Sequence, residues 1–542
     1  MLLGLAAAAS FFYRLGAVGL IGPDESSYAE VAREMVGLSD GVTPHLMGRP
    51  WLDKPPALFW IQAASQKLLG ENELAVRLPS ALAAVATSAV VAFLGFRLFG
   101  PAAGMASALI LSTTLGLTVF GRAAIPDTLL TFALTLGLAA YLVYSGGRRS
   151  SGWLALAFAA FGLAVLVKGP VGLVLPLLQI TFFHAIAGRQ GPKARARAKS
   201  LAVAAASFLA VAAPWHLLIL KAQGWSFLEE FLLEHNLDRY LTTVHRHPGS
   251  VLYYVPVLLA ELFPWSVLLP GAAAQATRQS GVAGRYLLIW VGVPFLFFSL
   301  AGSKLPGYAL PILPPCALLI GNYLTAEARP TAWTFPAHPF VALGLAAAIL
   351  YAFARHPALS LGDGLPLAGA LALASGAAWL YSRRKPQAIL PSLSASSLLL
   401  STVLVLDTAP RLEPYYSLKT LTLLARPRLV PGEKLICYKS FYREALFYSQ
   451  GRLSDVWTLQ EIALRAGQRG RLLALMERWR YEELALAPSL EVEIRCEVGG
   501  RVLAEIIPRP GVLSAEERRR EGASPCEPGC RGGAGSDKRL RP

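Results

Sequence analysis

Residues 153–187 read WLALAFAAFGLAVLVKGPVGLVLPLLQITFFHAIA, and Lys168 is the only lysine, arginine or acidic residue among them. A helix needs about 20 consecutive apolar residues to cross the hydrocarbon core of a bilayer. The run therefore predicts membrane-spanning structure, either as one broken helix or as two short ones. A glycine and a proline follow Lys168 directly, and they mark the point at which the run breaks.

The composition of the whole chain supports a membrane environment. Of the 542 residues, 54% are hydrophobic and 15% are charged, and the net charge is +16. Soluble domains hold about 25% charged residues. The cations occur in short clusters between apolar runs, which is typical of membrane loops and not of a nucleic-acid surface. We therefore expect a polytopic α-helical membrane protein that does not bind nucleic acid.

Apolar stretches of this kind recur as far as residue 407 and predict about 13 transmembrane helices. The N-terminal stretch lacks a basic start, so we interpret it as a first membrane helix and not as a cleaved signal peptide. The five cysteines are too scattered to form a disulfide framework. The predicted stretches are 1–20, 78–98, 103–120, 128–145, 153–167, 170–187, 200–220, 250–270, 284–301, 308–325, 335–354, 364–382 and 388–407.

Loop charges predict the orientation of these helices, because cytoplasmic loops collect lysine and arginine. If the first helix runs outward, nearly all clustered cations fall in the loops of one side, which is then the cytoplasmic side. The same scheme places segments 21–77 and 221–249, and the chain after residue 408, outside. It leaves isolated cations on the outer side, which a shared anionic ligand would explain: Lys54, Arg122, Lys168, Arg239 and Lys304.

The chain after residue 407 changes character. Residues 408–510 are expected to form a small α/β domain of soluble type, and residues 511–542, rich in Gly, Pro and charge, a disordered tail. Strand-like runs are KLICY (434–438), ELALA (483–487), EVEIRCEV (491–498) and RVLAEII (501–507), with helical patterns at 441–449 and 459–479.

The first outer loop holds the candidate catalytic chemistry. It begins GPDESSYAEVAREM (22–35) and contains LDKPPAL (52–58). Asp24 is either the N-cap of a helix or a reactive carboxylate, and Glu25 fits the helix dipole at the same position. Lys54 precedes two prolines, which fix its backbone; alternatively it is an interfacial cation whose charged end reaches water.

These motifs resemble the first outer loop of the GT-C superfamily of glycosyltransferases, which use polyprenyl-phosphate sugars. The similarity is greatest to the branch that holds the aminoarabinose transferase of lipid A and relatives of protein mannosyltransferases. Further matching motifs follow in order as far as residue 330: GRAAIPD (121–127), VKGPVGLVLP (167–176), EHNLDRY (234–240) and SLAGSKLPGYALP (299–311).

The resemblance implies a role for each candidate residue. Asp24 and Asp127 take the catalytic positions, with Glu25 and Tyr28 supporting them; Asp127 also fits a helix N-cap. The family positions that contact the phosphate of the donor correspond here to Lys54, Lys168, Arg239, Lys304 and Tyr308. Arg122 is a further candidate for binding the phosphate; alternatively, it forms a structural ion pair with Asp127. Relatives carry an arginine just before Tyr28, whereas this chain has Ser27, which leaves the acceptor open.

Asp53 and His235 match positions at which relatives could bind a divalent ion, so a divalent metal held by these two side chains is left possible. Two side chains do not make a metal site, so no cofactor is assigned on this basis.

The function predicted is transfer of a sugar from an undecaprenyl-phosphate donor to an acceptor at the periplasmic face of a bacterial inner membrane, with inversion. The acceptor is left open among lipid A phosphate, another glycolipid, a polysaccharide and a protein hydroxyl. The alternatives are a transporter or flippase for an anionic or lipid-linked substrate, and a membrane scaffold. A transporter places its charges near the bilayer midplane, whereas these charges fall at outer helix ends.

Overall fold

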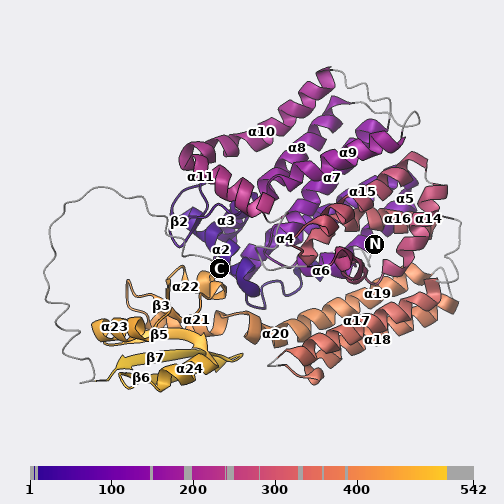
Figure 1. The fold of residues 1–542 in the computed structure, drawn as a ribbon. Helices are drawn as coiled ribbons and strands as arrows, with labels where there is room; N and C mark the ends of the chain where they lie inside the picture. Colours follow the sequence, from indigo (N-terminus) through magenta and orange to yellow (C-terminus); the bar gives the residue numbers. More distant parts are fainter. Residues whose placement is uncertain are drawn as a thin grey trace. The chain divides into compact units, whose positions relative to one another are not determined.

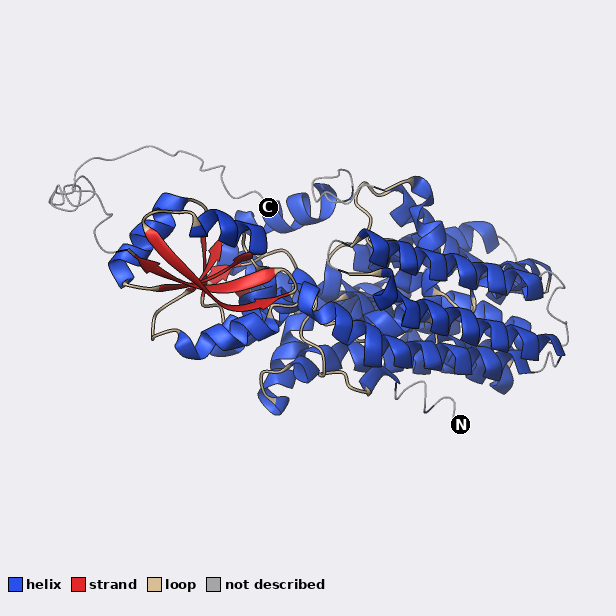
Figure 2. Cartoon of the chain, turned by 90° about the horizontal axis from the view of Figure 1, so that it is seen from below, coloured by secondary structure: helices blue, strands red, loops and turns tan. Residues whose placement is uncertain are grey.

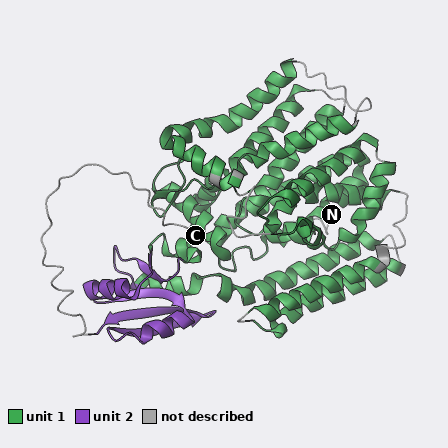
Figure 3. Cartoon of the chain, in the orientation of Figure 1, with its two compact units in different colours: residues 1–427, 442–453 green, residues 428–441, 454–542 purple. Residues whose placement is uncertain are grey.

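The computed structural model describes residues 5, 10–146, 150–187, 198–238, 240, 249–279, 281–326, 334–356, 359–384 and 388–509. The chain forms two compact units (Figure 3). The first comprises residues 1–427 and 442–453, and the second comprises residues 428–441 and 454–542. The segment 442–453 thus packs with the first unit although both of its neighbours in sequence belong to the second. The predicted tail 511–542 lies outside the described residues.

The loop before the first long membrane helix is ordered by its own short elements. Glu34 of helix α2 accepts hydrogen bonds from the backbone N–H groups of Met47 (2.6 Å) and Gly48 (2.9 Å), which fixes a small hairpin against that helix. Tyr28 packs on Trp51 and Phe59 with ring centroids 5.8 and 5.9 Å apart. The elements are α2 (Gly22–Gly37), β1 (His45–Leu46), β2 (Arg49–Pro50) and α3 (Ala57–Leu69).

The rest of the first unit is a bundle of apolar helices with one large buried core and a smaller cluster formed by Phe263 and residues of the helices at 334–403. Figure 1 shows α7, α8 and α9 packed together, and α17, α18 and α19 side by side. The helices are α4 (Glu73–Phe99), α5 (Pro101–Ser112), α6 (Leu115–Phe120), α7 (Asp127–Ser145), α8 (Ser151–Lys168), α9 (Val171–Ala187), α10 (Ala198–Gln223), α11 (Trp225–Phe227), η2 (Leu228–Asp238), η3 (Val251–Tyr253), α13 (Tyr254–Glu261), η4 (Ser266–Leu268), α14 (Leu269–Arg278), α15 (Gly281–Leu300), η5 (Pro306–Ile312), α16 (Leu313–Thr325), α17 (Thr334–Arg355), α18 (Leu361–Arg384), α19 (Ile389–Val403), η7 (Leu404–Thr408), α20 (Ala409–Tyr416) and α21 (Lys419–Ala425).

The protein is a multi-pass membrane protein. Within the described residues, 9 helices are long and apolar enough to cross a membrane, or 10 if the pair Val251–Glu261 and Ser266–Arg278, bent by 113°, counts as one span. The predicted number of about 13 transmembrane helices exceeds this count, because several of the 13 stretches form shorter helices that are not long enough to count as spans. The stretch 103–120 breaks at Thr113 and Thr114, and 170–187 is a short helix. The run 153–187 forms two helices, α8 and α9. Of the predicted first span 1–20, residues 1–4 and 6–9 lie outside the described residues, and residues 13–20 form turns and loop instead of helix.

The second unit is built on one mixed sheet of five strands in the order β4-β3-β5-β7-β6 (Figure 2). Strand β3 pairs with β5 in parallel, and β7 is antiparallel to both β5 and β6. Apolar side chains of α23 and α24 join the core of this sheet. The elements from residue 426 onward are η8 (Arg426–Arg428), β3 (Leu435–Tyr438), η9 (Arg443–Ala445), α22 (Leu446–Ser449), β4 (Leu453–Val456), α23 (Leu459–Arg469), β5 (Leu472–Glu477), α24 (Arg478–Ala485), β6 (Leu490–Val498) and β7 (Arg501–Pro508).

Two predicted elements of this region were wrong. The run ELALA (483–487) is not a strand, because its first three residues are the last three residues of helix α24. The predicted helix 459–479 ends at Arg469, since Gly470 adopts a left-handed backbone with φ +75°. The next residues form β5, whose first five side chains are all buried. A strand buried on both faces loses the alternation that identifies strands in a sequence.

Candidate functional site

One cavity of the first unit gathers residues from four of the motifs singled out in the sequence. Its volume is about 450 Å³, within the usual range for small-molecule sites. Lys54, Lys168 and His235 line it together with Asp53 and Tyr308. Most of its remaining wall is apolar, from Leu130, Val171, Val174, Leu232, Leu233, Phe297 and Phe298. Cations set beside apolar walls suit a ligand that has an anionic head and a hydrocarbon tail.

Two antiparallel helices bring Lys168 and Asp127 together. Lys168 is the last residue of α8 and Asp127 the first of α7, so both lie at the same end of the bundle. Lys168 Nζ is 2.6 Å from Asp127 Oδ1 and 4.6 Å from the centre of the Tyr308 ring. A cation at a helix C-terminus and a carboxylate at a helix N-terminus are each favoured by the helix dipole. The ammonium group is therefore held at the cavity wall by a carboxylate and an aromatic face.

Two glycines allow this close packing. Gly169 ends α8 with φ +77°, and a Cβ there would lie 2.7 Å from Phe231. Gly307 lies in η5, where a Cβ would be 2.9 Å from Asp127 Oδ1. Side chains at these positions would displace the neighbours of Lys168 and Asp127.

The other basic residues are distributed differently. Lys54 Nζ is 2.7 Å from Asp53 Oδ1, at the cavity. Lys304 is buried and donates to the carbonyl of Ala301; it follows Ser303, which lines the cavity. Arg239 lies outside the described residues, so its predicted place at the phosphate stays a prediction.

Arg122 does not line the cavity. Its guanidinium donates to the backbone carbonyls of Ser10 (2.5 Å) and Tyr13 (2.8 Å). Burial and the charge of Arg77 lower the pKa of Arg122 to about 10, so it stays protonated at neutral pH. The sequence left open an ion pair between Arg122 and Asp127. The structure does not show that pair, because the carboxylate of Asp127 is paired with Lys168. In the structure Arg122 anchors the N-terminal segment.

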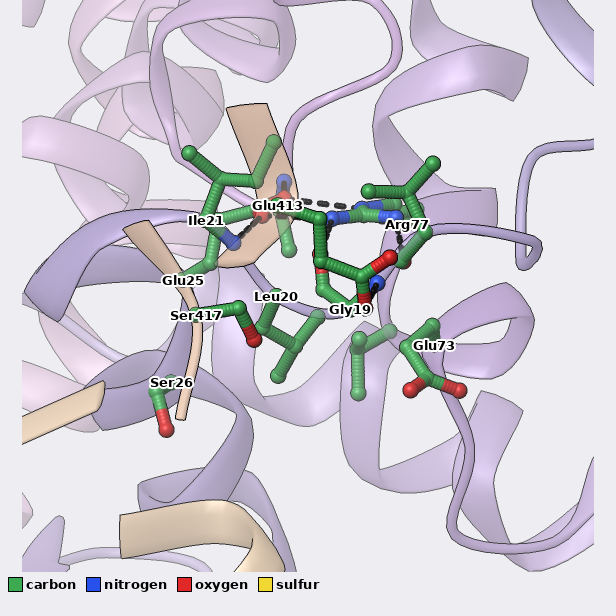
Figure 4. A network of polar contacts seen from close by, with 12 residues as sticks. Gly19, Leu20, Ile21, Glu25, Ser26, Glu73, Arg77, Glu413 and Ser417 are labelled. Carbon is green, nitrogen blue, oxygen red and sulfur yellow. Dashed lines mark hydrogen bonds and ion pairs between the residues drawn. The ribbon is translucent and has the colours of Figure 1, made fainter. Parts of the chain in front are cut away.

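Glu25 and Tyr28 are both held by contacts within the first unit, and their predicted support of Asp24 stays a prediction. Glu25 accepts hydrogen bonds from Arg77 at 3.0 and 2.7 Å. It also accepts from the backbone N–H groups of Ile21 (2.7 Å) and Ala124 (2.6 Å), which ties α2 to α4 and to the loop before α7 (Figure 4). Tyr28 belongs to the aromatic cluster with Trp51. Ser27, at the position where the family resemblance leads us to expect an arginine, is buried and donates to the Pro23 carbonyl at 2.7 Å.

Asp24 is exposed on the first turn of α2 and does not line the cavity. It lies one helical turn before Tyr28 and therefore on the same face of α2. Tyr28 packs on Trp51, two residues before Asp53 of the cavity. The catalytic role of Asp24 stays a prediction.

A divalent ion at Asp53 and His235 is not supported by the residues around it. His235 Nδ1 is 3.1 Å from Asp53 Oδ1, and the same oxygen contacts Lys54. Within the described residues no group of three or more His, Cys, Asp or Glu side chains is placed to hold a metal. Two side chains beside an ammonium group do not fit a divalent cation on their own, so we derive no step through a metal.

The sequence analysis did not single out three polar residues that line the cavity, Asn236, Tyr240 and Ser303. Asn236 donates to the Phe231 carbonyl at 2.6 Å, and Tyr240 to the Phe297 carbonyl at 3.2 Å. All three residues belong to motifs quoted from the sequence, EHNLDRY (234–240) and SLAGSKLPGYALP (299–311), and this membership could have identified them.

The fold places the protein in a class of polytopic helical membrane proteins that carry a small C-terminal sheet domain. A crystal structure of ArnT from Cupriavidus metallidurans bound to undecaprenyl phosphate matches with a TM-score of 0.77 at 24% identity, covering 93% of this chain and 97% of that one. Residues 53–217 match the model of a family described as dolichyl-phosphate-mannose-protein mannosyltransferase.

Curated relatives identify the family more closely. The undecaprenyl phosphate-α-4-amino-4-deoxy-L-arabinose arabinosyl transferase of Pseudomonas aeruginosa (strain UCBPP-PA14) is 32% identical over 386 residues, 68% of each chain. The enzyme of that name from Edwardsiella ictaluri (strain 93-146) is 32% identical over 312 residues, 56% of this chain. The match spans about half, 55%, of that relative's length. The chain belongs to the family of undecaprenyl phosphate-aminoarabinose arabinosyl transferases.

Proposed function

We propose that the protein transfers a sugar from an undecaprenyl-phosphate-linked donor to an acceptor at the periplasmic face of a bacterial inner membrane. The observation that carries this proposal is the cavity in which Lys54 and Lys168 lie beside an apolar wall. Such a cavity suits a phosphate joined to an isoprenoid chain. The names of the relatives make 4-amino-4-deoxy-L-arabinose the first sugar to test, and lipid A phosphate is the acceptor that we propose first.

The chemistry follows from the leaving group. Breaking the bond between the anomeric carbon and the phosphate oxygen leaves undecaprenyl phosphate with an additional negative charge. Lys54, Lys168 and Lys304, with Arg239, would stabilise that charge, and they would do so more strongly beside lipid than in water. Direct attack by the acceptor inverts the anomeric carbon, as the family resemblance implies.

The role of Asp24 depends on the acceptor. A hydroxyl acceptor needs a general base, and Asp24 is our candidate. A phosphate acceptor is already ionised, so in that case Asp24 would orient it or balance the positive charge that develops on the sugar. Tyr28 and Trp51 support this assignment, because their contact joins the Asp24 face of α2 to the segment that carries Lys54.

The test is transfer by purified protein from labelled undecaprenyl-phosphate-aminoarabinose to lipid A. We expect Asp24→Asn to abolish transfer while leaving membrane insertion and the thermal midpoint unchanged. The matched control is Glu229→Gln, which removes an exposed carboxylate of η2 that does not line the cavity and should leave the rate intact.

Normal transfer by Asp24→Asn would overturn the role of Asp24. Donor movement across proteoliposomes without any cleavage would instead support a transporter.

A further inference from the structure

The segment 442–453 packs against the start of the first outer loop. It contains η9 and α22, and it is part of the first unit (green in Figure 3). Phe447 and Tyr448 share a buried cluster with Leu20, Ala29 and Val76. A segment more than 400 positions away in the sequence therefore forms part of the surroundings of α2.

Tyr448 holds the residue that precedes α2. Its hydroxyl accepts a hydrogen bond from the backbone N–H of Leu20 at 2.7 Å and donates to Glu73 Oε1 at 3.0 Å. Burial and the neighbouring Glu73 raise the pKa of Tyr448, so the hydroxyl keeps its proton and can donate. A buried backbone N–H without this acceptor would cost about 1–3 kcal/mol.

The segment 442–453 also forms hydrogen bonds with Ser26, which follows Asp24 in the sequence. The backbone N–H of Phe447 donates to Ser26 Oγ at 3.2 Å, and that hydroxyl donates to the Glu444 carbonyl at 3.2 Å. Leu20 and Ser26 lie on either side of Asp24 in the sequence. The backbone that carries Asp24 is thus fixed at both ends by residues 444–448.

Neighbouring contacts hold the strip of chain before Asp24. Glu413 accepts from the backbone N–H of Gly19 at 2.8 Å, and Lys419 Nζ is 2.7 Å from Glu73 Oε1. Figure 4 shows Glu413, Glu73 and Ser417 around Gly19 and Leu20, with Glu25 and Arg77 joined by dashed lines. Glu73 therefore links Tyr448 to Lys419.

We propose that the segment 442–453, through Tyr448 and the backbone of residues 444 and 447, is a positioning element that holds Asp24 in the geometry needed for sugar transfer. This inference rests on the proposed function, because it takes Asp24 as a residue that acts on the substrates. The contacts of Tyr448 described above are with Leu20, Glu73 and its buried cluster and not with residues that line the cavity, so the segment acts on the geometry of the first loop and not on donor binding. A misplacement of about 1 Å can lower a rate by up to 10²-fold.

The decisive variant is Tyr448→Phe, which removes one hydroxyl and keeps the ring in its cluster. We expect kcat for transfer to fall about tenfold, with KM for the donor and the affinity for undecaprenyl phosphate unchanged. Ser26→Ala, which removes the other anchor, should lower kcat in the same way. The control is Ser449→Ala, which removes a buried hydroxyl of the same helix that donates locally to the Leu446 carbonyl at 3.0 Å.

The outcomes separate this inference from the proposed function. Unchanged kcat in Tyr448→Phe, together with loss of transfer in Asp24→Asn, would overturn the positioning role alone. The positioning role would also be overturned if Tyr448→Phe lost donor affinity to the same extent as kcat. The same holds if its rate fell only in proportion to the loss of folded protein. Full transfer by Asp24→Asn would remove the proposed role of Asp24 itself.

Discussion

At the scale of single residues, the site is a set of charges whose partners were not visible in the sequence. Lys168 was singled out because it breaks the loop-charge rule, and the structure places it at the cavity with Asp127 and Tyr308. Arg122 broke the same rule for another reason, since it donates to backbone carbonyls of the N-terminal segment. An unexpected cation therefore marks either a ligand site or a structural anchor, and its neighbours decide between them.

Lys168 gives the residue-scale prediction. We expect Lys168→Met to lower the transfer rate by about 10²-fold, because one cation that faces the departing phosphate is lost. Lys168→Arg, which keeps the charge, should retain more activity than the methionine variant. The measurement is the rate with purified protein, alongside its affinity for undecaprenyl phosphate.

Lys199→Met is the control for this variant, because Lys199 is an exposed cation near the start of α10 and does not line the cavity. Equal rates for Lys168→Met and the wild type would show that this cation does not serve the reaction.

At the scale of elements, the break between α8 and α9 sets the position of Lys168. Gly169 has φ +77° and ψ −149°, a conformation that is essentially confined to glycine. The motif K-G-P was visible in the sequence, but the contact of Gly169 with Phe231 of η2 was not. The glycine is needed both for the turn and for this close approach.

We expect Gly169→Ala to destabilise the protein by about 1–3 kcal/mol from backbone strain, with a further cost from contact with Phe231. Because that strain falls next to Lys168, donor affinity should fall as well. Thermal unfolding in detergent and binding of undecaprenyl phosphate measure the two effects.

The matched substitution is Gly376→Ala inside α18, where no atom lies within 4 Å of the added Cβ. It should leave stability unchanged or raise it. A Gly169→Ala protein as stable as Gly376→Ala would contradict the strain argument.

At the scale of the whole molecule, the chain folds as two units whose boundary does not follow the sequence. We predicted a single change of character near residue 407, whereas the structure assigns residues 408–427 and 442–453 to the first unit. The second unit is a small sheet with charged pairs between neighbouring strands. Glu505 of β7 lies 2.7 Å from Arg495 of β6 and 3.5 Å from Arg471, which precedes β5.

These pairs give a pH prediction for the second unit. Desolvation raises the pKa of Glu505, but the hydrogen bond from Arg495 and the charges of Arg495 and Arg471 outweigh it, so the pKa lies below its usual value. The stabilisation is therefore present above the pKa of the unfolded chain and is lost as pH falls through the lower pKa of the folded state. We expect the thermal midpoint of this unit to fall on acidification, and Glu505→Gln to weaken that dependence.

Tryptophan fluorescence of the full-length protein between about pH 3 and pH 7 measures this dependence around the usual glutamate pKa. Glu482→Gln serves as the control, because that carboxylate is 65% exposed. An identical acid dependence in the wild type and Glu505→Gln would contradict the prediction.

The sequence by itself determined the membrane class, the family resemblance and five of the polar or charged residues that line the cavity, Asp53, Lys54, Lys168, His235 and Tyr308. It did so because length, hydropathy and short motifs are local properties of a chain. It also favoured one side of the membrane for Lys54 and Lys168, and these two residues line one cavity.

Only the tertiary structure decided the rest. It placed Lys168 against Asp127, turned Arg122 to the N-terminal segment, and packed residues 442–453 onto the start of α2. It also showed that the predicted helix 459–479 is in fact a helix, α23, followed by a strand, β5. The apolar side chains of β5 are buried on both faces, so its sequence lacks the alternation of apolar and polar residues that identifies a strand. These outcomes depend on contacts between residues far apart in the chain, and no local pattern encodes which distant side chain will fill a given place.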